Sequence, residues 1–230
     1  VTVTIYRDCN GIPISNSLLE VSTGSGSANY TLQLISVKDI TGVNPNCPQS
    51  SKCSGSYQYG IEEHIYKANV KLFASSSCEY TFSWQQCCRN SNITTGAANE
   101  LFYIHTTYNK CLAPNNSSPS FLSFPVIFMG VGNDISVSHT AIDTVDNDFF
   151  SYELINPLKG PSSQINYSGS FANDRPISFL GYPNTALGYP AGFRFDTLSC
   201  NMSFRPTQVN QITVVTVKVV TVTVTTPKIV

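Results

Sequence analysis

The sequence contains few charged residues. Only 12% of its 230 residues are charged, and the formal net charge is -1. A chain without a basic stripe offers nothing to attract a phosphate backbone, so nucleic acid is not expected as a partner. With 41% apolar residues, the chain still has enough material for a buried core, which argues against disorder.

Long apolar runs are also missing. No run approaches the roughly 18 residues that a membrane-spanning helix needs, and no charged segment followed by an apolar one opens the chain. The sequence begins with VTVTIYRDC, which has the pattern of a strand from its first residue. We therefore expect no membrane span, and either a processed mature protein or a piece of a longer one.

The common catalytic motifs are absent. The sequence has no G-x-S-x-G, no H-E-x-x-H, no P-loop and no G-x-G-x-x-G before a helix. His64 follows two glutamates and is the best candidate for a general base. Alternation along EEHIYKANVKLF, however, puts it on the side of Tyr66 and Val70, which favours a position at the edge of a core. His105 and His139 have no nearby acid or nucleophile, so we predict that the protein is not an enzyme.

No stretch of ten or more residues has the pattern of an amphipathic helix, whereas alternating β patterns recur throughout. A segment rich in Asn, Ser and Pro at 110–121 separates two sets of strands and resembles a domain boundary. The sequence therefore predicts an all-β protein of two tandem β-sandwich domains, at 1–114 and 115–225, with 226–230 as a tail or linker. The expected strands are 1–6, 17–22, 30–38, 62–73, 79–86, 100–108, 125–129, 134–140, 149–155, 191–196, 201–204 and a run from 209.

The eight cysteines are even in number and irregular in spacing, which favours disulfides in an oxidising compartment over a zinc site. Adjacent Cys87 and Cys88 raise a special problem. Consecutive Cα atoms lie about 3.8 Å apart, less than the usual ~4.4–6.8 Å of bridged residues. We therefore expect each of them to have a separate partner. Cys47 and Cys53 are close enough in sequence to close a small loop, but eight cysteines allow 105 connectivities and the sequence does not choose among them. The expected disulfide residues are Cys9, Cys47, Cys53, Cys78, Cys87, Cys88, Cys111 and Cys200.

The run NQITVVTVKVVTVTVTT changes the face of its apolar residues twice, at Val215 and at Val220. A strand buried in one core keeps one parity, so each change predicts a bulge or another packing surface. We therefore predict that residues from about 220 onward leave their domain and join the next module or a neighbouring subunit. The alternative is that this stretch is the start of a linker.

The loop at 177–193 contains two Gly-Tyr-Pro sequences, at Tyr182 and Tyr189. Exposed aromatic rings on a loop provide stacking surfaces for sugars. The loop therefore supports a carbohydrate-binding module as an alternative function. The simpler interpretation, that the repeated pattern shapes an ordered turn, is the one we favour.

Several motifs carry a family resemblance that covers most of the chain. NSSPSF, HTAIDTVDNDFFSYEL, FRFDTLSCNMSF and the closing Val/Thr run resemble successive motifs of a cadherin-like repeat. In the first half, YRDCNG, CSGSYQYGIEEHIYKANVKL and YTFSWQQCCRN resemble modules of very large surface proteins of Bacteroidetes. That class includes gliding-motility adhesins and other cargo of the type IX secretion system.

The resemblance implies further sites. Asp143, Asp146 and Asp148 would be calcium ligands, with Asn115, Asn116 or Asp134 as additional oxygens; the alternative is a plain acidic turn. The A-x-D-x-D motif carries one extra residue here, and Cys200 replaces the usual glycine. The class also implies O-glycosylation at Thr144 and Thr197, although a sugar on Thr144 would crowd an ion at Asp143.

Together these patterns predict a non-catalytic, extracellular segment of a bacterial cell-surface adhesin or filament that acts as a rigid spacer. Its expected partners are neighbouring modules or identical subunits, through the C-terminal strand, and surface glycans. Calcium is the only cofactor that the motifs suggest.

Overall fold

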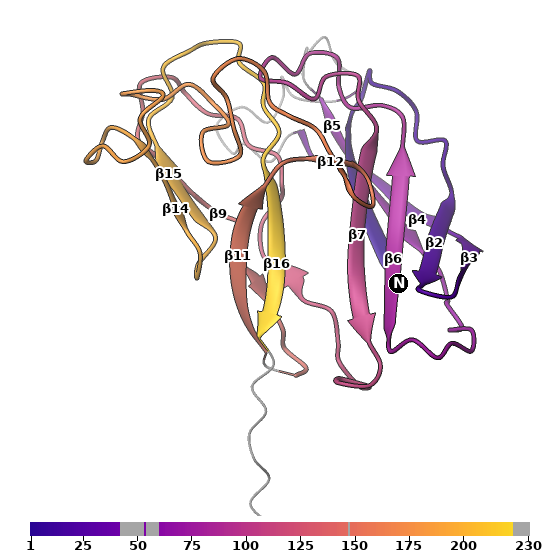
Figure 1. Cartoon of the computed structure of the whole chain (residues 1–230). Helices are drawn as coiled ribbons and strands as arrows, with labels where there is room; N and C mark the ends of the chain where they lie inside the picture. Colours follow the sequence, from indigo (N-terminus) through magenta and orange to yellow (C-terminus); the bar gives the residue numbers. More distant parts are fainter. Residues whose placement is uncertain (42–52, 54–59, 147, 223–230) are drawn as a thin grey trace, which may run out of the picture. The chain divides into compact units, whose positions relative to one another are not determined.

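The computed structural model describes residues 1–41, 53, 60–146 and 148–222, and it is all-β over these residues (Figure 1). The described residues contain no α-helix, and every strand pair whose register is described is antiparallel. The predicted all-β class is therefore confirmed. The strands are β1 (Thr2–Asp8), β2 (Leu18–Thr23), β3 (Gly26–Thr31), β4 (Gln33–Asp39), β5 (Ile61–Lys67), β6 (Glu79–Gln86), β7 (Phe102–Asn109), β8 (Ser120–Phe121), β9 (Ile135–Ser138), β10 (Ala141–Ile142), β11 (Phe149–Ile155), β12 (Leu158–Gly160), β13 (Ser163–Gln164), β14 (Phe193–Asp196), β15 (Asn201–Phe204) and β16 (Thr216–Val222).

The chain divides into two compact units. Unit 1 contains Val1–Asn90, Asn99–Pro114 and Leu158–Ser162; unit 2 contains Ser91–Ala98, Asn115–Pro157 and Ser163–Val230. The chain passes from unit 1 to unit 2 between residues 114 and 115. Two short segments are exchanged as well: 91–98 belongs to unit 2, and 158–162 belongs to unit 1. Sequence patterns gave no indication of these two exchanges.

Unit 1 is built from two sheets around a shared core. Their strand orders are β1-β5-β4 and β3-β2-β6-β7, and β6 and β7 run side by side over their full lengths (Figure 1). Both sheets contribute to one buried cluster. Its members are Val3, Ile5, Leu19, Val21, Leu32, Tyr66, Ala68, Tyr80 and Trp84.

Simple alternation explains which side chains of unit 1 face inward. In β1, Val3 and Ile5 are buried and alternate with the exposed Thr2 and Thr4. In β2, Leu19 and Val21 are buried and alternate with the exposed Leu18 and Glu20. Successive side chains of a strand point to opposite faces. The apolar residues at every second position therefore define the core face of each sheet.

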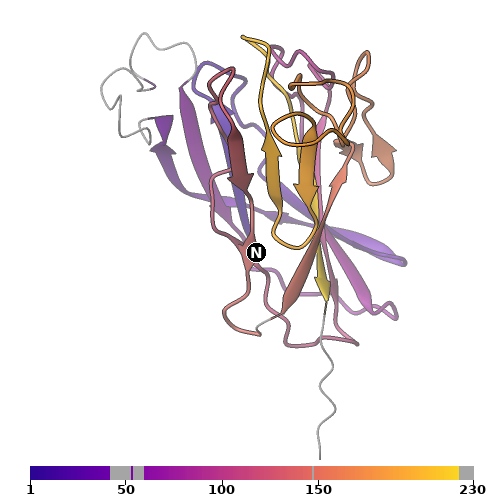
Figure 2. The same cartoon turned by 90° about the vertical axis from the view of Figure 1, so that its left-hand side faces the viewer.

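Most strands of unit 2 are shorter than β1–β7 of unit 1; the exceptions are β11 and β16. Its sheets are β9-β15-β14, β11-β16 and β8-β10, and the turned view shows the strands of the first of these next to one another (Figure 2). One buried cluster consists of Ile177, Phe179, Phe193, Met202 and Phe204. A second consists of Ala141, Tyr152 and Cys200.

Four predicted strands differ most from the observed ones, among them the run from 209, which forms a strand only from Thr216. The run 30–38 is interrupted at Leu32, which is buried and whose amide donates to the carbonyl of Ser17 at 2.7 Å. The run 62–73 ends at Lys67, because the registers of both neighbouring strands, β1 and β4, end opposite that residue. The run 125–129 follows an apolar pattern but forms no strand, and Phe128 within it is 61% exposed.

The closing Val/Thr run stays in its sheet up to the last described residue. β16 pairs with β11 in continuous register from Ile155↔Thr216 to Phe149↔Val222. The departure predicted from about residue 220 therefore does not occur before residue 223, and residues 223–230, which include the predicted 226–230 tail, lie outside the described residues. The first change of parity corresponds to a change of packing surface, because Val215 contacts the Phe179 cluster and Val217 the Tyr152 cluster. The second corresponds to Val220 pointing outward, without a bulge.

Candidate functional site

The first disulfide closes one end of the β6–β7 pair. Cys78 immediately precedes β6, and Cys111 lies two residues beyond β7. Glu79 and Asn109 are opposite one another in the register, and the amide of Lys110 donates to the carbonyl of Cys78 at 2.9 Å. The bond therefore fastens a strand pair that is already aligned by the sheet.

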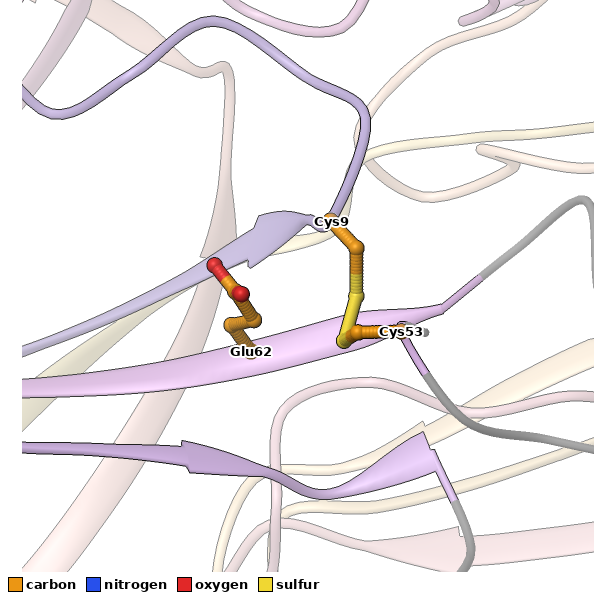
Figure 3. Close-up of side chains that lie close together, drawn as sticks. All are labelled: Cys9, Cys53 and Glu62. Atoms are coloured by element: carbon orange, nitrogen blue, oxygen red, sulfur yellow. A yellow bond between two sulfur atoms is a disulfide. The ribbon is translucent and has the colours of Figure 1, made fainter. Parts of the chain in front are cut away.

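The second disulfide joins Cys9, just after β1, to Cys53 (Figure 3). The carboxylate of Asp39 accepts the amide of Cys53 at 2.6 Å and the hydroxyl of Thr41 at 2.6 Å, which fixes the approach of this segment. A Cβ atom at Gly60 would lie 2.7 Å from Cys9 Sγ, so only glycine fits beside the bond. Cys53 is thus not the partner of Cys47, which lies outside the described residues.

Glu62 lies next to this disulfide. In the described part of the chain, Cys9, Cys53 and Glu62 are the one group of three potential metal ligands whose ligand atoms lie close together. The sulfurs of Cys9 and Cys53 are bonded to each other, however, and a metal requires free thiolates. One carboxylate oxygen of Glu62 already contacts Arg7 Nε at 3.2 Å and His64 Nε2 at 3.1 Å. The group is therefore a covalent staple beside an ion pair.

Cys87 and Cys88 form a disulfide with each other, contrary to the prediction of separate partners. That prediction assumed a trans peptide, whereas the Cys87–Cys88 peptide is cis and the two Cα atoms are 3.0 Å apart. Cys200, which was also expected in a bridge, is a fully buried free thiol of unit 2. Burial raises the pKa of this thiol, so the thiolate form is disfavoured.

Asp143, Val145 and Asp146 form a turn in unit 2. Asp143 Oδ1 accepts the amides of Val145 at 2.8 Å and Asp146 at 2.9 Å, and Ser117 Oγ donates to the same carboxylate at 3.1 Å. The Asp146 amide, followed by that of Val145, holds the pKa of Asp143 below its usual range. This is the hydrogen-bonding pattern of an Asx turn.

Calcium binding at the acidic segment stays a prediction. Within the described residues, the carboxylates of Asp143, Asp146 and Asp148 do not come together as a compact ligand group, whereas Ca²⁺ needs about six to eight converging oxygens. The proposed additional ligands are also directed elsewhere. Asp134 pairs with Arg205 at 2.7 Å, and the side-chain amide of Asn116 donates to the carbonyl of Ser117.

The two tyrosines of the 177–193 loop are not an exposed pair. The ring of Tyr182 packs against Phe179 and Phe171, each at 5.3 Å between centroids, and is half-buried. Tyr189 is 55% exposed, with the guanidinium of Arg194 over its ring at 5.7 Å. The predicted glycosylation residues Thr144 and Thr197 are both exposed.

The three histidines lie on β5, on β7 and just after β9. His64 is buried beside Glu62 and Tyr66, and His105 is on the exposed side of β7. His139 Nδ1 lies 3.0 Å from Ser123 Oγ, which is the distance expected of a nucleophile and its base. Ser123 Oγ donates to the carbonyl of Ser138 at 2.9 Å, however, so its proton is directed away from the histidine.

We expect His139 to make the stability of unit 2 sensitive to mild acid. Burial lowers its pKa in the folded state, so below about pH 6.5 the unfolded chain binds a proton that the folded chain resists. Stability should therefore fall as pH decreases through the unfolded pKa, and should change no further below the folded pKa. We expect His139→Gln to flatten the dependence of Tm on pH between 7 and 5. An unchanged slope would show that His139 does not carry this effect.

The sequence did not indicate two residues that position these sites. Asp39 organises the segment at Cys53, and Ser117 joins the linker to the acidic turn. Asp39 gave no signal, because it ends a strand like many other aspartates. Ser117 lay in the polar linker NNSSPS, and its proximity to the acidic turn depends on pairing between β8 and β10.

Comparisons with protein-family models, with curated proteins and with solved structures found no match to the chain. In the described part of the chain, no helix has the length and apolar character needed to cross a bilayer. The fold and its covalent links define an all-β protein of antiparallel sheets, stapled by disulfides.

Proposed function

We propose that this chain is a non-catalytic, extracellular segment of a bacterial cell-surface adhesin or filament, of the kind found in Bacteroidetes, and that it acts as a rigid spacer. The supporting observation is the placement of the Cys9–Cys53 and Cys78–Cys111 bonds at strand ends of unit 1. A bond at the end of a strand resists separation of the sheet where it would otherwise fray. Such bonds persist in oxidising compartments.

The proposed partners are neighbouring modules or identical subunits, reached through the C-terminal strand. The edges of the β11–β16 pair support this role, because edge strands pair readily with another chain. Calcium is not required for the proposed spacer.

Mapping disulfides on protein taken from its natural surface tests the proposal. Mass spectrometry of non-reduced peptides, compared with a reduced sample, should recover Cys9–Cys53 and Cys78–Cys111 as linked pairs and Cys87–Cys88 as a bond within one peptide. Free thiols at Cys78 and Cys111 in the native protein would contradict an extracellular, stapled segment. Reduced cysteines would indicate an intracellular protein.

Carbohydrate binding is the alternative, and the exposed ring of Tyr189 is the observation that favours it. A sugar needs a stacking surface, and Tyr182 contributes none because its ring packs inward. A spacer should bind no sugar on a glycan array. Binding that is lost in Tyr189→Ala and retained in Tyr182→Phe would instead establish the module.

A further inference from the structure

The β3-β2-β6-β7 sheet of unit 1 (Figure 1) has a shallow hollow of about 340 Å³ on its outer face. Leu19, Val21 and Trp84 of this sheet belong to the buried core, so the side chains that alternate with them point away from the core. The hollow lies among these outward side chains, next to the segment that leads into β2. Its lining residues are Asn16, Leu18, Glu20, Asn29, Ser83 and Gln85.

The register of the sheet places three polar side chains of the hollow in one row. Glu20 on β2 is opposite both Asn29 on β3 and Ser83 on β6. Residues that are directly opposite one another point to the same face, with their Cβ atoms about 4.5–5.5 Å apart. Leu18 and Gln85, two residues further along β2 and β6, lie on that face as well. A ligand in the hollow would therefore meet a carboxylate, two side-chain amides, a hydroxyl and an aliphatic surface together.

Ser83 is the residue of the hollow that most needs a partner. It is only 6% exposed and lines the hollow, yet its hydroxyl forms no hydrogen bond within the described residues. The side chains of Glu20, Asn29 and Gln85 also have no hydrogen bond or ion pair there. A buried hydroxyl without a partner is unfavourable. A ligand that bonds to Ser83 would remove this cost.

Asn16 holds the margin of the hollow in place. Its side chain donates to the carbonyl of Gln85 at 2.7 Å and accepts the amide of Leu18 at 3.0 Å. The backbone carbonyl of Asn16 accepts Trp84 Nε1 at 3.1 Å. These three bonds join the segment before β2 to β6 and to the core. A site that is fixed in this way before binding loses little conformational freedom when the ligand arrives.

The groups in the hollow favour a neutral ligand with several hydroxyls. A sugar hydroxyl both donates and accepts, and so do the side chains of Asn29, Ser83 and Gln85. The carboxylate of Glu20 can accept two neighbouring hydroxyls, but it would repel an anion. A single carboxylate is also a poor site for Ca²⁺, which needs about six to eight oxygen ligands. Leu18 is 45% exposed and offers an aliphatic surface to the C–H groups of a sugar ring.

We propose that unit 1 binds a neutral hexose of a glycan in this hollow, with sugar hydroxyls at Glu20, Asn29 and Ser83 and with ring carbons against Leu18. The inference goes beyond the spacer function, which by itself requires no sugar contact. It also uses no residue of unit 2, so it differs from binding through Tyr189. The expected dissociation constant is on the order of a millimolar, because the hollow is small and open. Several copies on one surface would raise the overall affinity by avidity.

Saturation-transfer NMR with the full chain tests the site. The probes are the methyl glycosides of glucose, galactose and mannose, and we expect saturable binding of at least one of them. Ser83→Ala should weaken that binding by about three- to tenfold, the effect expected of one lost hydrogen bond. Ser22→Ala is the matched control. Ser22 lies on the same face one row away and outside the hollow, so its replacement should leave the affinity unchanged.

Glu20→Ala provides a second variant that does not disturb a buried position, because Glu20 is exposed. It should weaken binding at least as much as Ser83→Ala, since hydrogen bonds to charged groups are stronger.

Two results would overturn the proposal. The first is the absence of saturable binding of all three glycosides at about 100 mM, far above a millimolar dissociation constant. The second is binding that persists in both Ser83→Ala and Glu20→Ala, or that Tyr189→Ala abolishes, because the sugar would then bind elsewhere. Neither result bears on the disulfide mapping, so failure of this site is distinguishable from failure of the spacer function.

Discussion

Replacing Cys78 and Cys111 together by serine is expected to lower the free energy of unfolding of unit 1 by about 3–4 kcal/mol. The bond closes a loop with a sequence separation of 33. Without the bond, the unfolded chain regains the conformational freedom of this loop. Trp84 is the only tryptophan and lies in the core of unit 1. Its fluorescence during denaturant unfolding therefore reports on this unit.

Cys200→Ala is the matched control for this experiment. It removes a cysteine from unit 2 that forms no bridge, so the unfolding transition followed by Trp84 should stay in place. An equal shift of the unfolding transition in the control and in the double serine variant would contradict a stabilising role of the Cys78–Cys111 bond. So would a double serine variant that unfolds at the wild-type denaturant concentration.

Trp84→Ala should cost about 3–5 kcal/mol of the stability of unit 1, the usual range for removing a large buried ring. Trp84 is 3% exposed, its Nε1 donates to the carbonyl of Asn16 at 3.1 Å, and its ring meets Phe102 edge-on at 5.9 Å. The truncation leaves a cavity and removes the donor of a hydrogen bond. Because this variant has no tryptophan, its unfolding is followed by circular dichroism instead of fluorescence.

Two further variants separate the ring from its surroundings. Trp84→Phe keeps an aromatic ring but removes the donor to Asn16, so it should cost less than Trp84→Ala. Leu112→Ala alters an aliphatic residue of unit 1 that is 82% exposed, and it should change stability by no more than about 0.5 kcal/mol. If Trp84→Ala fell within that same range, the core assignment would be contradicted.

Both predictions concern β6, which links the core of unit 1 to its staples. Tyr80 and Trp84 extend from this strand into the core, Cys78 precedes it, and the Cys87–Cys88 bond follows it. Tyr80 is 1% exposed and its hydroxyl donates to the carbonyl of Phe73 at 2.6 Å. A strand with buried aromatic anchors, tied at one end to its neighbour, suits the proposed spacer function.

Much of the β structure could be predicted because alternation is a local property. The strands at 1–6, 17–22 and 79–86 lie close to β1, β2 and β6. Prediction failed where a strand depended on its neighbours. PVIFM has a strand-like composition, but among the described residues no strand pairs with it, and Lys67 ends β5 because its partners end there.

The sites were less predictable than the strands. Local sequence placed Asp143, Asp146 and Asp148 close together, but the direction of their oxygens depends on the amides of Val145 and Asp146 and on Ser117. Similarly, the spacing of Tyr182 and Tyr189 suggested a pair of exposed rings. Only the packing of Phe171 and Phe179 directs the first of them inward.

The sequence by itself determined the all-β class, the presence of disulfides and the inward faces of the main strands, because composition and a two-residue period are carried by neighbouring residues. Tertiary structure decided which cysteines meet: Cys9 with Cys53, Cys78 with Cys111, and Cys87 with its own neighbour, while Cys200 remains a buried thiol. It also decided that the acidic segment is a hydrogen-bonded turn. These outcomes depend on distances between residues that are remote in sequence, and on the isomer of a single peptide, neither of which a local pattern specifies.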